Sequence, residues 1–172
     1  MRNPARQYCG ALIAASLLSF AAAGCLYSFT GASVPAHLKT VAIPLVDDQS
    51  GFGEPGLREK FTAEIVQQFT SDNSLEVSDR NTSDSILEGA ILSISDAPAV
   101  VSQGEQVTRR RLTLTARFAF QDKKLRKKVW EKTFSNWGEY DSGGGLSQRQ
   151  VGLQDAMKKI AEDVLLETVS GW

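Results

Sequence analysis

Apolar residues recur along the chain with two different periods, and each period predicts its own kind of element. A four-residue period, typical of one face of an amphipathic helix, runs through Leu57, Phe61, Ile65 and Phe69. A longer stripe predicts a second helix of about 20 residues near the C-terminus. Its members are Leu153, Met157, Ile160, Val164 and Thr168, extended by Leu165 and Val169. Pro55 suits the first position of the first helix, and Ser147 can cap the second.

The first half of the chain also holds segments that predict strands. Residues 40–45 alternate in polarity, and Pro44 places this strand at an edge of the sheet or near the strand's own end. Residues 75–77 predict a short strand. Residues 85–95 carry apolar residues on both parities, which is typical of a central strand that is covered, at least in part, on two sides.

Two further strands are predicted in the second half, over residues 107–121 and 129–140. In the first of these, apolar and polar residues alternate, which predicts one dry and one wet face. The dry face holds Leu112, Leu114, Phe118 and Phe120, and the wet face holds Arg111, Thr113, Thr115 and Arg117. In the second strand the apolar phase shifts between Phe134 and Trp137, which predicts a bulge or a twist there.

The order of these elements predicts the fold class. Helices and strands interleave as β-α-β-β-β-β-α, yet three long strands follow one another. This order favours an α+β fold, a two-layer sandwich in which two helices pack on one face of a mixed sheet. The sheet is expected to have four strands, or five if residues 75–77 are included. Residues 47–53 and 141–145 are rich in turn-forming residues and are expected as loops.

The N-terminal residues have the pattern of a bacterial secretory leader. Two arginines supply the positive start, residues 9–23 form an apolar stretch, and Ala22-Ala23-Gly24 is a small-residue cleavage site. Cys25 follows at once, so residues 1–24 predict a lipoprotein signal peptide and Cys25 the acylated N-terminus of a bacterial lipoprotein. An ordinary secretory signal and a spanning helix are the alternatives. A spanning helix is disfavoured because the apolar run is short of the roughly 20 residues that a bilayer requires.

Acylation of Cys25 divides the remaining chain into two parts. Residues 25–38 form the lipidated N-terminus and a small, polar tether, and residues 39–172 form a single domain. Two or more acyl chains, palmitate among them, hold a protein on a membrane nearly permanently. Leu26 stands where aspartate would favour the inner membrane, and by resemblance to lipoprotein sorting rules it favours the outer one. We therefore expect a lipid anchor on the periplasmic face of the outer membrane.

Charge and cysteine content exclude two classes of protein. Arg2 and Arg6 leave with the leader, so 17 of the 19 basic residues remain against 20 acidic residues and the net charge changes from −1 to −3. This balance argues against a general nucleic-acid binder. Cys9 also leaves with the leader and Cys25 is bonded to lipid, so no disulfide can form within the mature chain. Packing must therefore stabilise the domain.

The sequence offers no convincing catalytic or metal-binding set. His37 is the only histidine and lies in the tether, where we expect it to be a plain solvated residue. One histidine and scattered carboxylates do not predict a transition-metal site, and no Ser-His-acid or Cys-His set can be assembled without it. Asp47-Asp48 is expected as a solvated turn, and Gly143–Gly145 lacks the Lys-Ser/Thr ending of a phosphate loop. We therefore predict no cofactor, no metal and no enzymatic activity.

Positive charge is concentrated in two short runs. Five of the six positions 123–128 are basic, around Leu125, and a second run occupies residues 109–111. Residues 111 and 123 are 12 positions apart, about 40 Å along an extended strand, so the runs cannot form one patch on that strand alone. The first run is consistent with a hairpin tip guarded against edge pairing or with contact to phosphate and other anionic groups. Arg117, on the wet face, could join either run.

Three aromatic residues allow a ligand or partner role. Trp130 and Trp137 are expected to be packing residues rather than ligand platforms. Phe52 lies in the loop before the first helix and is either a partner anchor or a cap on the core.

Several short motifs, taken in their order along the chain, resemble a known family. They are Cys25-x-Tyr27-Ser28-Phe29, Val41-Ala42-Ile43-Pro44, Gly53-Glu54-Pro55-Gly56-Leu57 and Ala90-Ile91-Leu92, followed by a long C-terminal helix. Together they resemble the lipopolysaccharide-assembly lipoprotein family LptE, in the form found in Bacteroidetes and Chlorobi-like bacteria. The resemblance covers nearly the whole mature chain.

The resemblance implies a fold, a partner and a mechanism. LptE proteins have two helices on a four-stranded sheet and sit as a plug inside the LptD β-barrel, and the pair inserts lipopolysaccharide into the outer leaflet of the outer membrane. This activity is binding and assembly, not catalysis. A plug also needs a large polar face that is buried in the complex, and the wet face around Thr113, Thr115 and Arg117 is the candidate.

The resemblance further implies that basic side chains meet lipopolysaccharide phosphates. The candidate lipopolysaccharide-binding residues are Arg109, Arg110, Arg111, Arg117, Lys123, Lys124, Arg126, Lys127 and Lys128.

A second resemblance keeps another function open. Asp48-Gln49-Ser50-Gly51, after an opening strand and before an amphipathic helix, resembles lipoproteins that activate or scaffold a cell-wall synthase or a curli-type secretion pore. The two readings differ in their partner, which is LptD in one and a synthase or an oligomeric pore in the other. Ring formation by the isolated protein would favour the second.

Overall fold

The computed structural model describes residues 34–99, 109–170 and 172, which belong to one unit of the chain, Ala32–Trp172. The predicted leader, Cys25 and residues 26–33 of the predicted tether lie outside the described residues. Helix α2 spans Leu57–Asp72 and helix α3 spans Gly145–Ser170, after a single 3₁₀ turn, η1, at Ser142–Gly144.

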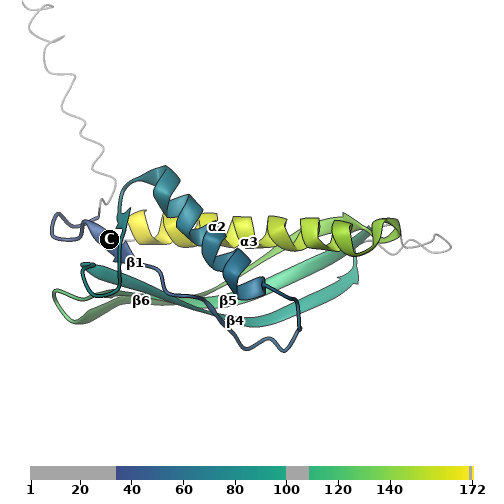
Figure 1. Ribbon diagram of the computed structural model, residues 1–172, viewed down its shortest axis with the longest axis horizontal. Coiled ribbons are helices and arrows are strands. Elements are labelled where there is room, and N and C mark those ends of the chain that lie inside the picture. Colours follow the sequence, from purple (N-terminus) through teal and green to yellow (C-terminus); the bar gives the residue numbers. More distant parts are fainter. Residues whose placement is uncertain (1–33, 100–108, 171) are drawn as a thin grey trace, which may run out of the picture. The chain divides into compact units, whose positions relative to one another are not determined.

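One mixed sheet lies beneath the two helices. Its six strands are β1 (Thr40–Ala42), β2 (Asp47–Asp48), β3 (Glu76–Val77), β4 (Ser85–Pro98), β5 (Arg109–Asp122) and β6 (Lys127–Asp141). The strand order is β3-β1-β4-β5-β6, and β2 pairs with β4. β1 is parallel to β3 and β4, whereas β4, β5 and β6 form an antiparallel meander. Both helices cover the same face of the sheet (Figure 1), so the predicted α+β sandwich is confirmed.

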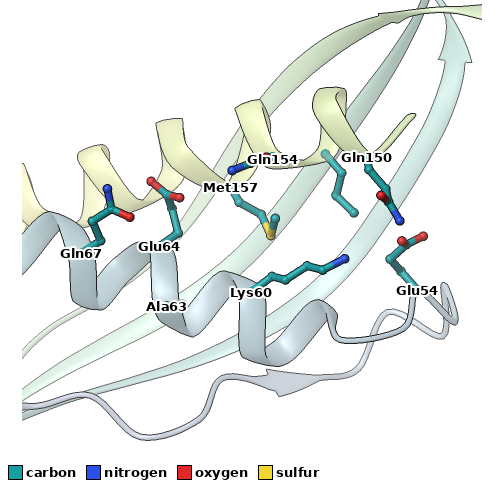
Figure 2. A pocket seen from close by; sticks show the side chains of 9 residues that line it. Glu54, Lys60, Ala63, Glu64, Gln67, Gln150, Gln154 and Met157 are labelled. Atoms are coloured by element: carbon teal, nitrogen blue, oxygen red, sulfur yellow. The ribbon is translucent and has the colours of Figure 1, made fainter. Parts of the chain in front are cut away.

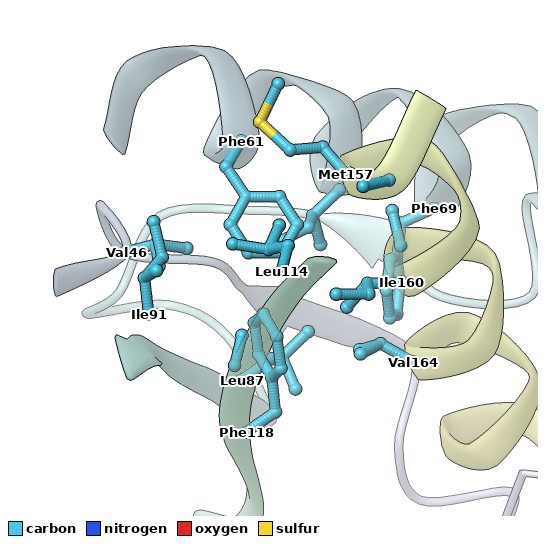
Figure 3. Packing of buried hydrophobic residues seen from close by; sticks show 14 of the residues in the cluster. Val46, Phe61, Phe69, Leu87, Ile91, Leu114, Phe118, Met157, Ile160 and Val164 are labelled. Atoms are coloured by element: carbon cyan, nitrogen blue, oxygen red, sulfur yellow. The ribbon is translucent and has the colours of Figure 1, made fainter. Parts of the chain in front are cut away.

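The core lies between the helices and the sheet. All four residues of the first predicted stripe are buried along α2, as are the five main residues of the stripe on α3. The dry face of β5 meets them, and the Phe61 and Phe118 rings pack edge to face with centroids 5.8 Å apart. Figure 3 shows Phe61, Leu114 and Met157 converging from three different elements. Burial of these faces is the main stabilising contribution, at roughly 25 cal/mol per Å² of apolar surface.

The helices begin at other residues than predicted, because glycine conformations set their starts. Gly56 has φ 71°, in the left-handed region, and α2 begins directly after it at Leu57, so Pro55 lies outside the helix. Helix α3 begins at Gly145 and has 26 residues, about 39 Å at 1.5 Å per residue. Ser147 is therefore inside α3, where its hydroxyl donates to the Gly144 carbonyl oxygen, and it is not the cap.

The predicted bulge in the last strand lies elsewhere. The pairing of β5 with β6 is continuous past Phe134 and Trp137, and the register shifts between Phe120 and Gln121, opposite Val129. The apolar phase changes because Trp137 points to the face without helices, where it is 41% exposed. A second irregularity, between Ile91 and Ser93 of β4, was not indicated by the sequence pattern.

Candidate functional site

The face of the sheet that carries no described helix, here called the outer face, is the surface that the wet side of β5 predicts. It consists of the outward-pointing residues of β4, β5 and β6. Its middle is lined by small hydroxyl side chains, because the register sets Thr113 opposite Ser95 and Thr115 between Ser93 and Ser135. The Thr115 and Ser135 hydroxyl oxygens are 3.0 Å apart and hydrogen-bonded. The hydroxyl side chains of this middle region are uncharged and able to accept or donate hydrogen bonds to a partner.

At one end of the outer face two predicted residues share a carboxylate. Glu139 accepts an ion pair from Arg111 at 2.8 Å and one from Arg109 at 3.2 Å. The hydrogen bond from Arg111 lowers the pKa of Glu139. The Arg111 guanidinium also lies 4.0 Å from the centroid of the Trp137 ring, and the Lys159 ammonium lies 4.6 Å from it. Trp137 thus packs against two cations on the surface and is not part of the core, whereas Trp130 is buried as a packing residue and stacks on Phe120.

At the other end a second carboxylate pairs with two cations. Glu131 lies 3.7 Å from Arg117 and is also paired with Lys128, whose hydrogen bond lowers the pKa of Glu131. These groups surround a shallow depression of about 270 Å³ with small residues in it, namely Gly89, Ala90 and Ala119. The outer face thus carries four of the predicted basic residues at its two ends, which are Arg109, Arg111, Arg117 and Lys128.

Arg110 does not lie on the outer face, because side chains alternate between the two faces along β5. Its side chain points to the helix side of the sheet, where Nε donates to Asp96 at 2.9 Å and to the Tyr140 hydroxyl at 3.1 Å. The hydrogen bond to Asp96 raises the pKa of Arg110. The Tyr140 hydroxyl donates to the same carboxylate at 2.7 Å, and Arg149 of α3 lies 3.7 Å from it. These contacts join β4, β5, β6 and α3, so Arg110 has a structural role in this fold.

The turn between β5 and β6 divides the remaining candidates into bound and free side chains. Lys123 donates to the carbonyl oxygens of Arg80 and Ser83, the second at 2.9 Å. Lys124 donates to the His37 carbonyl oxygen at 2.7 Å and pairs with Asp84 at 2.9 Å. Arg126 and Lys127 make no ion pair or side-chain hydrogen bond with any residue that the structure describes.

The last described part of the predicted tether lies on the domain. Leu38 is buried and Val34 packs against the core. The expectation that His37 is a plain solvated residue is wrong, because its Nε2 lies 2.6 Å from the Asp122 carboxylate, whose side chain is 3% exposed. Burial raises the pKa of Asp122, but hydrogen bonds from His37 and from the Leu125 backbone N–H outweigh it, and the net shift is downward.

Asp84 also joins the described end of the tether to the β5–β6 turn. It accepts backbone N–H groups of Lys39 and Thr40 at 2.8 and 3.3 Å. The hydrogen bond from Lys124, followed by that from the Lys39 backbone, lowers the pKa of Asp84 from 3.8 to about 2. Sequence reasoning missed these partners because they are 40 or more positions away from Asp84.

A cavity of about 390 Å³ lies between the two helices (Figure 2). Leu153 and Met157 of α3 supply its apolar part, and the rest of its lining is charged or amide side chains, with Ala63 between them. Lys60 and Glu64 reach it from α2. Within residues 34–99 and 109–170, no group of three or more His, Cys, Asp or Glu side chains is placed to hold a metal ion. No described helix is long and apolar enough to cross a membrane.

Comparison with known proteins gives a family and a fold. A family model for lipopolysaccharide assembly, LptE, matches residues 38–168. No curated protein matches the sequence. Among solved structures, protein XCC0632 from Xanthomonas campestris is similar at a TM-score of 0.58 and 12% identity, over 80% of this chain and 90% of that one.

Two further solved structures share the fold. Protein CT253 from Chlamydia trachomatis has a TM-score of 0.54 and 10% identity, over 76% of this chain and 98% of that one. A PelC dodecamer from Paraburkholderia phytofirmans has a TM-score of 0.52 and 14% identity, over 81% and 95% of the two chains. Identities this low concern the fold and not the function.

Proposed function

The chain belongs to the LptE family of lipopolysaccharide-assembly proteins, and we propose that it is an outer-membrane lipoprotein that works as the plug and assembly partner of an LptD-like β-barrel. The match to residues 38–168 carries this proposal, because it includes every described strand, all of α2 and α3 up to Thr168. The role is binding and assembly, in which the barrel and the protein together insert lipopolysaccharide into the outer leaflet. No step in this role requires a catalytic group.

The membrane attachment in this proposal rests on the N-terminal pattern. Residues 1–24 act as the lipoprotein signal peptide, and Cys25 carries the acyl chains on the periplasmic face of the outer membrane. Residues 25–33 then link the lipid to the domain that begins with the packed residues Val34 and Leu38.

The outer face is the surface that we propose for the barrel. A plug is surrounded by the polar interior of a barrel, so its contact face must offer hydrogen bonds without unpaired buried charges. The hydroxyl groups around Thr113 and Thr115 can make hydrogen bonds to the barrel. The charges on this face are already paired, Arg111 with Glu139 and Arg117 with Glu131. The helix side is less suited, since its apolar stripes are already buried in the core.

The competing proposal is a self-assembling envelope scaffold. PelC shares the fold and forms a dodecamer, and the Asp48-Gln49-Ser50-Gly51 segment resembles lipoproteins of secretion pores and synthase activators. Such a protein would be recovered as a homo-oligomer or with a synthase, and not with a single barrel.

One crosslinking experiment separates the two proposals. A photo-crosslinking amino acid is placed at Thr115 on the outer face of the full-length chain and, as a matched control, at Lys158 on the solvent side of α3. After irradiation of intact cells, the lipidated protein is purified and its adducts are identified by mass spectrometry. Recovery of a large β-barrel from position 115, but not from 158, supports the LptE role. Self-adducts without a barrel contradict it and favour the scaffold.

A further inference from the structure

The tip of the β5–β6 turn is held in a fixed conformation by one buried carboxylate. One oxygen of Asp122 accepts the Leu125 backbone N–H at 2.8 Å, and its other oxygen lies 2.6 Å from His37 Nε2. Arg126 has φ 51°, in the left-handed region, which completes the turn. Asp122 therefore couples the shape of the tip to the segment that leads back toward Cys25.

That segment enters the domain directly beside the tip. Besides the His37–Asp122 pair, the Lys124 ammonium binds the His37 carbonyl oxygen at 2.7 Å. His37 is 12 positions after Cys25, and a fully extended chain of that length spans at most about 43 Å. A lipid on Cys25 thus limits how far the tip can move from the membrane surface.

The tip presents an apolar side chain beside two free cations. Leu125 is 66% exposed, the second largest value among the exposed large hydrophobic residues. Arg126 and Lys127 follow it and have no partner among the described residues, although four of the other predicted basic residues nearby are bound, namely Lys123, Lys124, Lys128 and Arg117. An exposed leucine beside two unpaired cations matches the chemistry of a membrane interface, where an apolar side chain enters and cations meet phosphate groups.

We propose that Leu125, Arg126 and Lys127 form a second membrane contact, in which Leu125 enters the periplasmic leaflet that holds the lipid anchor and the two cations bind the phosphates of anionic phospholipids. The inference rests on the proposed anchor at Cys25 and adds the orientation of the domain: the turn end of the sandwich faces the leaflet, and the end where α3 begins faces away. The contact is weak on its own, and the short tether makes it effective by keeping the local concentration of lipid high.

The test uses the full, acylated chain in vesicles that contain lipids with a quenching bromine. A fluorescent label is attached to cysteine at position 125 (Leu125→Cys) or, as a matched control, at position 146 (Leu146→Cys). Leu146 is 74% exposed and lies at the start of α3, at the opposite end of the sheet from the turn (Figure 1). We expect quenching at 125 but not at 146 in vesicles with phosphatidylglycerol, and its loss in phosphatidylcholine or in high salt.

Charge removal gives the quantitative part of the test. Each basic residue near an anionic surface contributes about fivefold to binding, so Arg126→Gln with Lys127→Gln lowers the docking constant of the tip ~25-fold. Equal quenching at positions 125 and 146, no quenching at 125, or quenching that appears with lipopolysaccharide and not with phosphatidylglycerol would overturn the inference. The last result would assign the tip to lipopolysaccharide binding instead.

Failure of the anchor can be told apart from failure of the tip. Mass spectrometry of the purified chain shows whether Cys25 carries acyl chains. If it does not, the anchor proposal fails, and the tip is tested in a Cys25→Ser chain held by a histidine tag before residue 25 on nickel-chelating lipid. Quenching at 125 in that chain supports the tip as a membrane contact, and its absence contradicts it.

Discussion

Gly138 of β6 and Gly152 of α3 pack backbone against backbone, so that a Cβ atom on Gly138 would lie 2.0 Å from the Gly152 carbonyl oxygen. A Cβ on Gly152 would instead meet the Tyr140 side chain at 3.3 Å. This contact sets how closely the long C-terminal helix approaches the last strand. The two glycines are both buried, yet their tolerance for a side chain differs.

Gly138→Ala is therefore expected to destabilise the domain by about 3 kcal/mol, because the obstacle is helix backbone and cannot rotate away. Gly152→Ala is the matched control. Its tight contact opposes a gain of about 1 kcal/mol in helix propensity, so its effect should be within about 1 kcal/mol of zero. Urea unfolding of both variants measures the difference. Equal losses would show that α3 can shift along the sheet.

A cross-strand pair predicts non-additive mutations. Gly89 of β4 lies opposite Phe118 of β5, and a Cβ on Gly89 would lie 2.3 Å from the Phe118 ring. We expect Gly89→Ala to cost about 1–3 kcal/mol in the wild-type chain. In a Phe118→Leu background the ring is absent, so Gly89→Ala should destabilise the domain less. The coupling free energy between the two substitutions is expected to be at least about 1 kcal/mol.

The control for this cycle is Phe120→Leu, which changes a ring on the same strand and face but not the one that covers Gly89. Unfolding free energies from urea titrations supply all the values. If Gly89→Ala costs the same in both leucine backgrounds, the ring of Phe118 is not what restricts residue 89.

Asp84 predicts a pH dependence of stability. Its pKa is lowered from 3.8 to about 2 by Lys124 and the Lys39 backbone N–H, and its side chain is 16% exposed. The pKa of Asp84 is lower in the folded chain than in the unfolded chain. Asp84 therefore contributes fully to the free energy of unfolding above the unfolded-state pKa, and this contribution is lost as the pH falls toward about 2.

At pH 7, Asp84→Asn should cost about 2 kcal/mol. The difference in unfolding free energy between Asp84→Asn and the wild type should narrow between pH 4 and pH 2. Asp79→Asn, in the same turn, is the control, because its carboxylate contacts the nearby Asn81 backbone and no basic side chain. A constant difference across this range would mean that the carboxylate charge of Asp84 is not the source of its effect.

Hydrophobic periodicity predicted correctly which face of a single helix or strand is buried. The stripe Leu57, Phe61, Ile65 and Phe69 and the alternation in β5 are local, so the sequence shows them directly. Element ends were less predictable, because Gly56 and Gly145 set the two helix starts with positive φ values that no hydrophobic period reveals. The position of Trp137 on the outer face was also not predictable, because an aromatic residue there does not follow the alternation of buried and exposed positions along β6.

At the candidate site, too, the sequence predicted the local pattern of the basic residues but not their distant partners. Their clustering is visible in the sequence, and so is the separation of the two runs along one strand. Which of them are free depends on partners far away in the chain: Lys124 pairs with Asp84, 40 positions before it, and Asp122 with His37, 85 positions before it. Composition cannot supply these pairings, because they follow from the packing of β1 and β4 beside the turn.

The nine candidate residues should therefore separate into two classes when each is replaced. Arg110 holds Asp96 and Tyr140 on the helix side, so Arg110→Gln is expected to lower the melting temperature by a few degrees and to leave lipopolysaccharide binding unchanged below that temperature. Arg117 lies on the outer face with a single long contact, 3.7 Å from Glu131, and is about half exposed. Arg117→Gln is expected to preserve the melting temperature, since Lys128 still pairs with Glu131.

Arg117→Gln should nevertheless weaken lipopolysaccharide binding several-fold, because charge-assisted bonds to phosphate are stronger than neutral ones. The measurement is binding of labelled lipopolysaccharide to the full chain at a temperature where both variants are folded, with circular dichroism melts beside it. Arg110 and Arg117 are the matched pair, since they lie on one strand and point to opposite faces. Equal loss of binding in both variants would mean that overall positive charge, and not the outer face, attracts lipopolysaccharide.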